Sequence, residues 1–260
     1  MRSVFESWDR VAVRLKNASQ RLLLFDFDGT LVPIRSHAEE VYLPPKTQRL
    51  LQALAAQPRC TVGIVSGRAL QDLRKRVGVQ GLLYVGNHGF EIQRGPDVFI
   101  HPSANAKSGI LRNLAEAITS HLKGIKGVRV ENKGYTLSIH YRHVAPGQIS
   151  CVQETVRTLV RERTVPGALF LKNGKMAIEI RPERMWHKGS AVHLLRRSEP
   201  AGTCVLYVGD DSTDEDVFRI LSREDISVHI GPGLTQAQYV VRGPMDVRHM
   251  LKRLIRMAEE

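Results

Sequence analysis

The stretch Leu22-Leu23-Leu24-Phe25-Asp26-Phe27-Asp28-Gly29-Thr30 decides the fold of this chain. Four apolar residues in a row predict a short strand that is buried on both faces, as in a parallel sheet. Asp26 and Asp28 follow at positions i and i+2 of extended chain, so their side chains point the same way. Burying two carboxylates at the end of an apolar strand is costly, and we therefore expect them to serve a function.

Four more apolar runs of this kind each end at a Gly or a polar residue, at 61–65, 82–85, 204–208 and 226–230. Helical patterns lie between the runs, at 45–57, 69–77, 188–197 and 214–221. Strands that alternate with helices predict an α/β fold built on a parallel sheet.

The middle of the chain breaks this alternation. Helical patterns at 104–122 and 148–163 alternate with two strand pairs, 128–130 with 136–141 and 168–171 with 176–180. Asn173-Gly174, inside the second pair, is a hairpin turn signal. We expect an inserted α+β domain at 104–184, with its helices on one face of a small sheet, and a core made of 1–103 and 185–260.

A second acidic cluster, Gly209-Asp210-Asp211-Ser212-Thr213-Asp214-Glu215-Asp216, directly follows the run at 204–208. Ligands of open parallel sheets bind beyond the carboxyl ends of the strands, so this cluster and Asp26 should share one crevice. Two carboxylates about 4 Å apart repel by roughly 4 kcal/mol at an effective dielectric near 20. A hard divalent cation such as Mg²⁺ offsets that repulsion. The alternative, a helix cap, is favoured for Asp216, because Thr213-x-x-Asp216 resembles a capping box.

Two further residues are expected at the same edge. Ser66 follows the run at 61–65; it could cap the next helix, or its hydroxyl and the adjacent N–H groups could hold a phosphate. Lys188 opens the helix at which the chain re-enters the core. A lone Lys is normally a surface group, and only this position makes Lys188 a candidate.

Composition narrows the classes of function. The net charge is +12, which suits either nucleic acid or an anionic small molecule. No Lys/Arg block is interleaved with stacking aromatics, which disfavours a nucleic-acid partner. Cys60, Cys151 and Cys204 have no metal or redox spacing. Without a signal peptide or an apolar run near the roughly 20 residues of a membrane span, we expect a cytoplasmic protein with no membrane partner.

Four motifs in this order resemble the haloacid dehalogenase superfamily of phosphotransferases: Asp-Phe-Asp-Gly-Thr-Leu, Ser-Gly-Arg, Lys-Gly and the 209–216 cluster. The last motif, with Gly86-Asn87-His88-Gly89 and Glu131-Asn132-Lys133-Gly134, resembles more narrowly the trehalose-6-phosphate phosphatase family. The resemblance covers about residues 20–255. It implies a Rossmann-like core with a mobile cap inserted after the third core strand, which agrees with the insertion at 104–184.

The resemblance also implies roles for the residues of the crevice. Asp26 would attack phosphorus and form an aspartyl phosphate, and Asp28 would act as general acid and then as general base. Mg²⁺ would be held by Asp26, by the backbone carbonyl of Asp28 and by Asp210, with Asp211 and Asp214 around it. Ser66 and Lys188 would clamp the phosphoryl oxygens.

Substrate-binding candidates follow from the same resemblance: Arg68, Asn87 and His88 in the core, and Glu131, Lys133, His140, Arg142, Lys175 and Glu179 in the cap. For His140, Arg142 and Lys175 the solvated face of a half-buried sheet remains an equal alternative. The bulky pair Trp186-His187 before Lys188 departs from the family pattern and puts the local hinge in doubt.

The resulting hypothesis is a Mg²⁺-dependent phosphatase that releases trehalose and phosphate from trehalose 6-phosphate. Two alternatives stay open. One is a phosphatase of another sugar phosphate, of the sucrose, glucosylglycerol or mannosylglycerate type, and the other is an inactive sugar-phosphate sensor. A trehalose-6-phosphate synthase partner cannot be derived from the sequence.

Overall fold

The structure, a computed structural model, describes residues 2–35, 40–174 and 176–259. Its contacts divide the chain into two compact units. Unit 1 comprises Met1–Phe99 and Trp186–Glu260, and unit 2 comprises Ile100–Met185. The insertion expected at 104–184 lies within unit 2.

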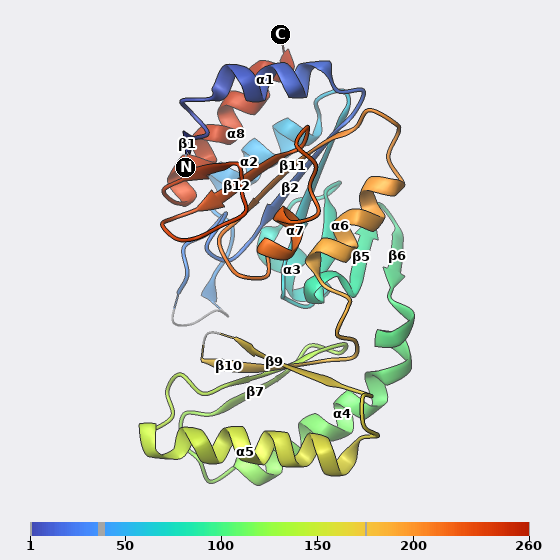
Figure 1. Ribbon diagram of the computed structural model, residues 1–260, viewed down its shortest axis with the longest axis vertical. Helices are drawn as coiled ribbons and strands as arrows, with labels where there is room; N and C mark the ends of the chain where they lie inside the picture. Colours follow the sequence, from blue (N-terminus) through green and yellow to red (C-terminus); the bar gives the residue numbers. More distant parts are fainter. Residues whose placement is uncertain (1, 36–39, 175, 260) are drawn as a thin grey trace. The chain divides into compact units, whose positions relative to one another are not determined.

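Among the described residues, unit 1 is built on a nine-stranded sheet (Figure 1) with the order β1-β13-β12-β11-β2-β3-β4-β5-β6. The strands are β1 (Arg2–Ser3), β2 (Arg21–Asp26), β3 (Cys60–Val65), β4 (Leu83–Gly86), β5 (Glu91–Arg94), β6 (Asp97–Ile100), β11 (Cys204–Gly209), β12 (Ile226–Ile230) and β13 (Tyr239–Val241). In this order, every pair of neighbouring strands from β1 at the edge as far as β4 is parallel, including the pairs that involve β13, β12 and β11. The strand β5 runs antiparallel to β4. The prediction of an α/β fold with a parallel-sheet core is confirmed.

The strand order reverses direction between β2 and β11. From β2 the chain moves outward through β3 to β4, and from β11 it moves the other way through β12 to β13. Such a reversal is the point at which doubly wound sheets open a crevice beyond the carboxyl ends of their strands. The two acidic stretches follow the two strands that flank this point.

Helices cover both faces of the sheet (Figure 1). One face packs against α1 (Trp8–Asn17), α2 (Pro45–Ala55), α3 (Leu70–Val77) and α8 (Pro244–Glu259), and the other against α6 (Lys188–Arg197) and α7 (Glu215–Phe218). In β2, Leu23 and Phe25 join the first cluster, whereas Leu22 and Leu24 join the second. Burial on both sides explains why the run is apolar at every position, and each such side chain contributes roughly 1.5–3 kcal/mol.

Unit 2 holds a four-stranded antiparallel sheet with the order β7-β8-β10-β9. Its elements are α4 (Pro102–Leu122), β7 (Arg129–Asn132), β8 (Leu137–His140), α5 (Pro146–Arg163), β9 (Phe170–Gly174) and β10 (Ala177–Arg181). Leu137, Ile139, Ile178 and Ile180 point into the core shared with α4 and α5, which both lie on one face of the sheet (Figure 1). The other face carries the polar residues that alternate with them.

The hairpin of β9 and β10 turns later than the sequence signal indicates. Asn173 pairs with Ile178 and Gly174 pairs with Ala177, so both residues belong to β9 and the chain turns after them. The prediction of a turn at Asn173-Gly174 is wrong. In the observed register Ile178 and Ile180 point into the core of unit 2.

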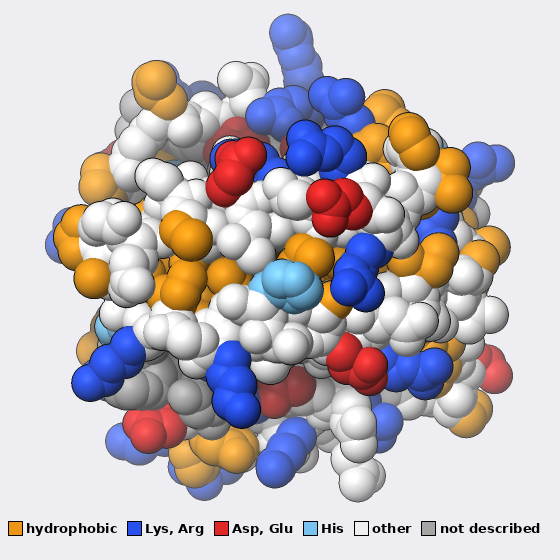
Figure 2. Space-filling view, turned by 90° about the horizontal axis from the view of Figure 1, so that it is seen from below, with side chains coloured by type: hydrophobic (Ala, Val, Ile, Leu, Met, Phe, Trp, Pro, Cys, Tyr) orange, Lys and Arg blue, Asp and Glu red, His pale blue; other side chains and the backbone are white. Residues whose placement is uncertain are grey.

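Positive charge is concentrated in unit 2. Residues 100–185 hold 14 Lys and Arg residues and 6 Asp and Glu residues, a net +8 of the chain's +12. On the face in Figure 2, the basic side chains lie among acidic and apolar ones. Among the described residues, no helix is both long enough and apolar enough to cross a membrane.

Candidate active site

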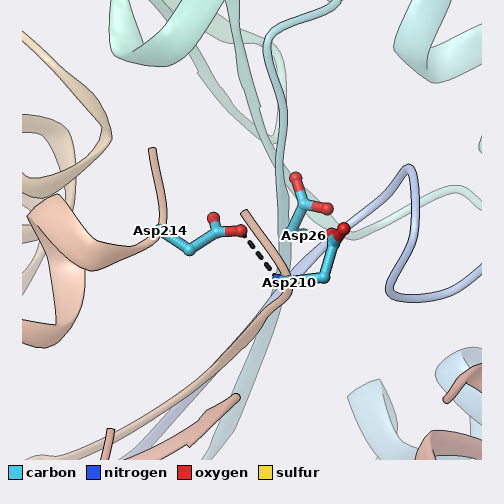
Figure 3. Close-up of side chains that lie close together, drawn as sticks. All are labelled: Asp26, Asp210 and Asp214. Carbon is cyan, nitrogen blue, oxygen red and sulfur yellow. Dashed lines mark hydrogen bonds between the residues drawn. The ribbon is translucent and has the colours of Figure 1, made fainter. Parts of the chain in front are cut away.

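Three carboxylates converge at the carboxyl edge of the unit 1 sheet (Figure 3). Asp26 is the last residue of β2, Asp210 directly follows β11, and Asp214 lies four residues further along. One carboxylate oxygen of each lies within 4.8 Å of the others. The structure thus brings together acidic groups from stretches almost two hundred residues apart, as expected of a crevice at the strand reversal.

Two glycines allow this close approach. Gly29 has a φ of +91°, and a Cβ built on it would lie 2.2 Å from Oδ2 of Asp210. A Cβ on Gly209 would lie 2.2 Å from Cγ of Asp214. Any larger residue at either position would push one carboxylate out of the cluster.

Asp214 organises the acidic loop from its fully buried position. Its Oδ2 accepts hydrogen bonds from the backbone N–H of Asp210 at 2.9 Å (dashed in Figure 3) and of Asp211 at 3.0 Å. Its Oδ1 accepts from Nζ of Lys188 at 2.8 Å and from the hydroxyl of Tyr207 at 2.6 Å. These four donors satisfy a buried carboxylate that would otherwise be very costly.

Lys188 connects this anchor to Asp26. It is the first residue of α6, only 2 % exposed, and its Nζ lies 2.7 Å from Oδ1 of Asp26. Burial opposes the charged form, but the carboxylates of Asp214 and Asp26 outweigh it and raise the pKa of Lys188 well above its ordinary value. Lys188 is therefore a buried ammonium between two carboxylates.

One ammonium does not balance this cluster. Burial raises the pKa of Asp26 well above its ordinary value, with Lys188 opposing and Asp214 and Asp210 adding to the rise. Burial and the charges of Asp214 and Asp211 raise the pKa of Asp210 to about 7. The donors are all oxygens and carry excess negative charge, which is the chemistry that suits a hard divalent cation.

Asp28 faces the more open side of the site, with its side chain 38 % exposed. Its two oxygens accept hydrogen bonds from Nε and Nη2 of Arg68, both at 2.7 Å. Arg68 also donates to Asp72 at 3.0 Å and stacks over the ring of Phe27. We expected Arg68 to contact the substrate. In this structure it orients Asp28.

Ser66 is buried at the end of β3, and its hydroxyl accepts a hydrogen bond from the N–H of Arg68 at 3.2 Å. It is not a helix cap, because the N-cap of α3 is Ala69. Asn87 and His88 follow β4 with positive φ, and the amide of Asn87 donates to Glu91. The backbone N–H of Asn87 donates to the backbone carbonyl of Arg68, and that of His88 donates to the backbone carbonyl of Ser66. These bonds hold the expected site residues together at one edge of the sheet.

The remaining candidates lie in unit 2. His140 contacts Glu131, with 3.0 Å between Nε2 and Oε2. Burial raises the pKa of Glu131, but the hydrogen bond from His140 and the charge of Lys133 outweigh it and lower that pKa to about 2. Glu179 pairs with Arg181, and Arg142 is exposed. Lys175 lies outside the described residues.

The expected capping box at Thr213 and Asp216 is wrong. Thr213 donates to Oδ1 of Asp211 through both its N–H and its hydroxyl, whereas Asp216 accepts from Arg219. The turn around Asp211 uses Thr213 before α7 begins. A capping box occurs instead at α6, where His187 and Ser190 bond reciprocally, so the bulky residue before Lys188 caps the helix.

The chain is similar to known proteins over most of its length. A model of the trehalose-phosphatase family matches residues 24–242. The trehalose-phosphate phosphatase of Mycobacterium tuberculosis is 34 % identical over 254 residues, which cover 94 % of this chain and 63 % of that protein. The chain thus spans about three fifths of the length of the curated relatives it matches.

Solved structures show the same fold. A trehalose-6-phosphate phosphatase related protein superposes with a TM-score of 0.81 at 24 % identity, over 92 % of this chain and 98 % of that one. The trehalose-6-phosphate phosphatase of Aspergillus fumigatus superposes with a TM-score of 0.67 at 28 % identity, over 95 % of this chain and 97 % of that one.

Proposed function

We propose that this chain, which belongs to the trehalose-phosphatase family, is a phosphoric monoester hydrolase. The reaction would release trehalose and phosphate from trehalose 6-phosphate. The observation that carries this proposal is the cluster of Asp26, Asp210 and Asp214 around Lys188, which lies within the residues matched by the family.

The protein's own residues supply the steps of the reaction. A carboxylate oxygen of Asp26 attacks phosphorus, and the bond to the sugar oxygen breaks, which leaves an aspartyl phosphate. Asp28 gives a proton to the departing sugar oxygen and then takes one from the water that cleaves the aspartyl phosphate. The hydroxyl of Ser66 and the ammonium of Lys188 hold the phosphoryl oxygens as their charge develops.

We propose Mg²⁺ as the cofactor, because the site is made of oxygen donors with more negative charge than Lys188 balances. The carboxylates of Asp26 and Asp210 and the backbone carbonyl of Asp28 would hold it. When bound, the ion would offset charge on the phosphoryl oxygens. Asp211 and Asp214 shape the loop that presents Asp210.

We propose that unit 2 is the cap that selects the substrate. Its net charge of +8 attracts a dianionic phosphate. The two carboxylates Glu131 and Glu179 lie on the polar face of its sheet and suit the hydroxyls of a sugar ring.

A panel of phosphoesters tests the function. With Mg²⁺ present, we expect kcat/KM for trehalose 6-phosphate to exceed the value for p-nitrophenyl phosphate, and for sucrose, glucosylglycerol and mannosylglycerate phosphates, by about a hundredfold or more. Asp26→Asn is the inactive control. Preference for another sugar phosphate would overturn the substrate assignment. Tight binding of trehalose 6-phosphate without turnover would favour a sensor.

A further inference from the structure

The polar face of the unit 2 sheet presents two carboxylates on either side of a small residue. Glu131 of β7 pairs with Ser138 of β8, and Ser138 pairs with Glu179 of β10. Directly paired residues of antiparallel strands share a face, so all three lie opposite the helices. Two strand spacings place the two glutamate backbones about 10 Å apart.

Each carboxylate lies against a basic side chain of the same sheet. Nε2 of His140 lies 3.0 Å from Oε2 of Glu131, and Nη2 of Arg129 lies 3.9 Å from the same oxygen. Arg181 donates to Oε2 of Glu179 through Nε at 3.1 Å and also through Nη2. Arg181 lies two residues after Glu179 on β10 and so shares its sheet face. His140 lies on β8, which pairs with β7, the strand of Glu131.

Arg181 is the more telling of the two donors. Arg181 is only 5 % exposed, and the side chain of Glu179, two residues before it on β10, is 19 % exposed. Burying a guanidinium is costly, and a charge-assisted bond in a fixed geometry is what offsets that cost. A residue needed only for solubility on this face would not be buried in this way.

We infer that His140 and Arg181 are positioning residues, which fix Glu131 and Glu179 as an oriented carboxylate pair for the hydroxyls of the sugar. The inference rests on the proposed function, since it assigns how the same site recognises its substrate. It also changes the expected role of His140, which acts through Glu131 rather than on the sugar. A phosphoester without sugar hydroxyls gains nothing from this pair.

The first test compares two substrates in the full-length protein. His140→Gln and Arg181→Gln should each raise KM for trehalose 6-phosphate by about tenfold, with a smaller change in kcat. Their kinetics with p-nitrophenyl phosphate should stay within about twofold of wild type. His143→Gln and Arg157→Gln are matched controls, because both side chains are exposed in unit 2 and neither residue lies on a strand of its sheet. An equal loss with both substrates would overturn the inference.

Double-mutant cycles separate positioning from direct contact. If His140 acts through Glu131, the variant E131Q/H140Q should be no worse than E131Q alone, and E179Q/R181Q no worse than E179Q. The cross pair H140Q/R181Q should multiply the two single losses. Multiplied losses within either donor–carboxylate pair would show that the donor acts by itself.

Folding and function are kept apart by two further measurements. Arg181→Lys retains the charge, so it should recover part of the rise in KM seen with R181Q, at an unchanged melting temperature. If R181Q unfolds, R181K alone tests the role of Arg181. A wild-type KM with R181K would contradict a need for the guanidinium. If the wild-type protein prefers another sugar phosphate, the proposed function fails, but the same cycles with that substrate still test the positioning role. If it hydrolyses none, calorimetric binding of trehalose 6-phosphate replaces KM.

Discussion

Gly29→Ala should disable the site through one added methyl group. The new Cβ would lie 2.2 Å from Oδ2 of Asp210, well inside van der Waals contact, so the carboxylate must retreat by roughly 1 Å or more. The loop cannot follow easily, because the N–H of Asp210 is bonded to the buried Asp214. The φ of +91° adds a backbone cost of about 1–2 kcal/mol.

Gly81→Ala is the matched control for this variant. Gly81 has a φ of +78°, and a Cβ on it meets nothing within 4 Å. We expect both variants to lose a few degrees in melting temperature. Only Gly29→Ala should lose Mg²⁺ affinity by calorimetry and about a hundredfold or more in kcat/KM. Equal Mg²⁺ affinity and activity in the two variants would refute the argument that Asp210 must lie against the segment after β2.

Three further predictions concern charge. Lys188→Met leaves Asp26 and Asp214 buried without their ammonium, so unfolding experiments at neutral pH should show a loss of about 3–5 kcal/mol. That deficit should shrink toward about pH 5, because the carboxylates then take up protons; an equal deficit throughout would contradict the ion triad. Because burial and nearby carboxylates raise the pKa of Asp210 to about 7, above its unfolded value, the metal-free fold loses stability as the pH rises toward 7. Calorimetric Mg²⁺ affinity should increase over the same range and level off above it, and a flat profile would exclude Asp210 as a ligand. Added salt should lower kcat/KM for trehalose 6-phosphate while kcat stays constant, since it screens the charge of unit 2; no salt effect would argue against electrostatic attraction.

The convergence of the site was predictable because it depends on strand ends. Continuous apolar runs mark β2 and β11 as buried strands, and parallel strands in one sheet place their carboxyl ends at one edge. Asp26 and Asp210 could therefore be placed together without knowledge of any contact.

Other parts had weak signals in the sequence. Tyr207 sits inside a buried run, where nothing distinguishes a hydroxyl that bonds to Asp214 from ordinary core packing. The strands β5, β6 and β13 have three or four residues, too few for a periodic pattern. For α8, in contrast, Val247, Met250, Leu251 and Leu254 do follow the helical period, so this helix was predictable.

Local turn chemistry failed where two arrangements fit the same residues. Thr213 could cap a helix through Asp216 or bond to Asp211, and the buried Asp214 selects the second by fixing the loop. Arg181, which we infer to position Glu179, is not among the candidates from the sequence, although its spacing of two from Glu179 on a strand predicts a shared face. Only the register of β10 shows that the pair lies beside Glu131.

The most direct test is to find the covalent phosphate. Asp28→Asn should still react with p-nitrophenyl phosphate, whose leaving group needs no proton, but should hydrolyse the aspartyl phosphate slowly because the general base is gone. Reduction of the quenched protein with borohydride and mass spectrometry should then reveal homoserine at position 26. Release of p-nitrophenol with Asp26 unmodified, or modification of a different carboxylate, would contradict the account.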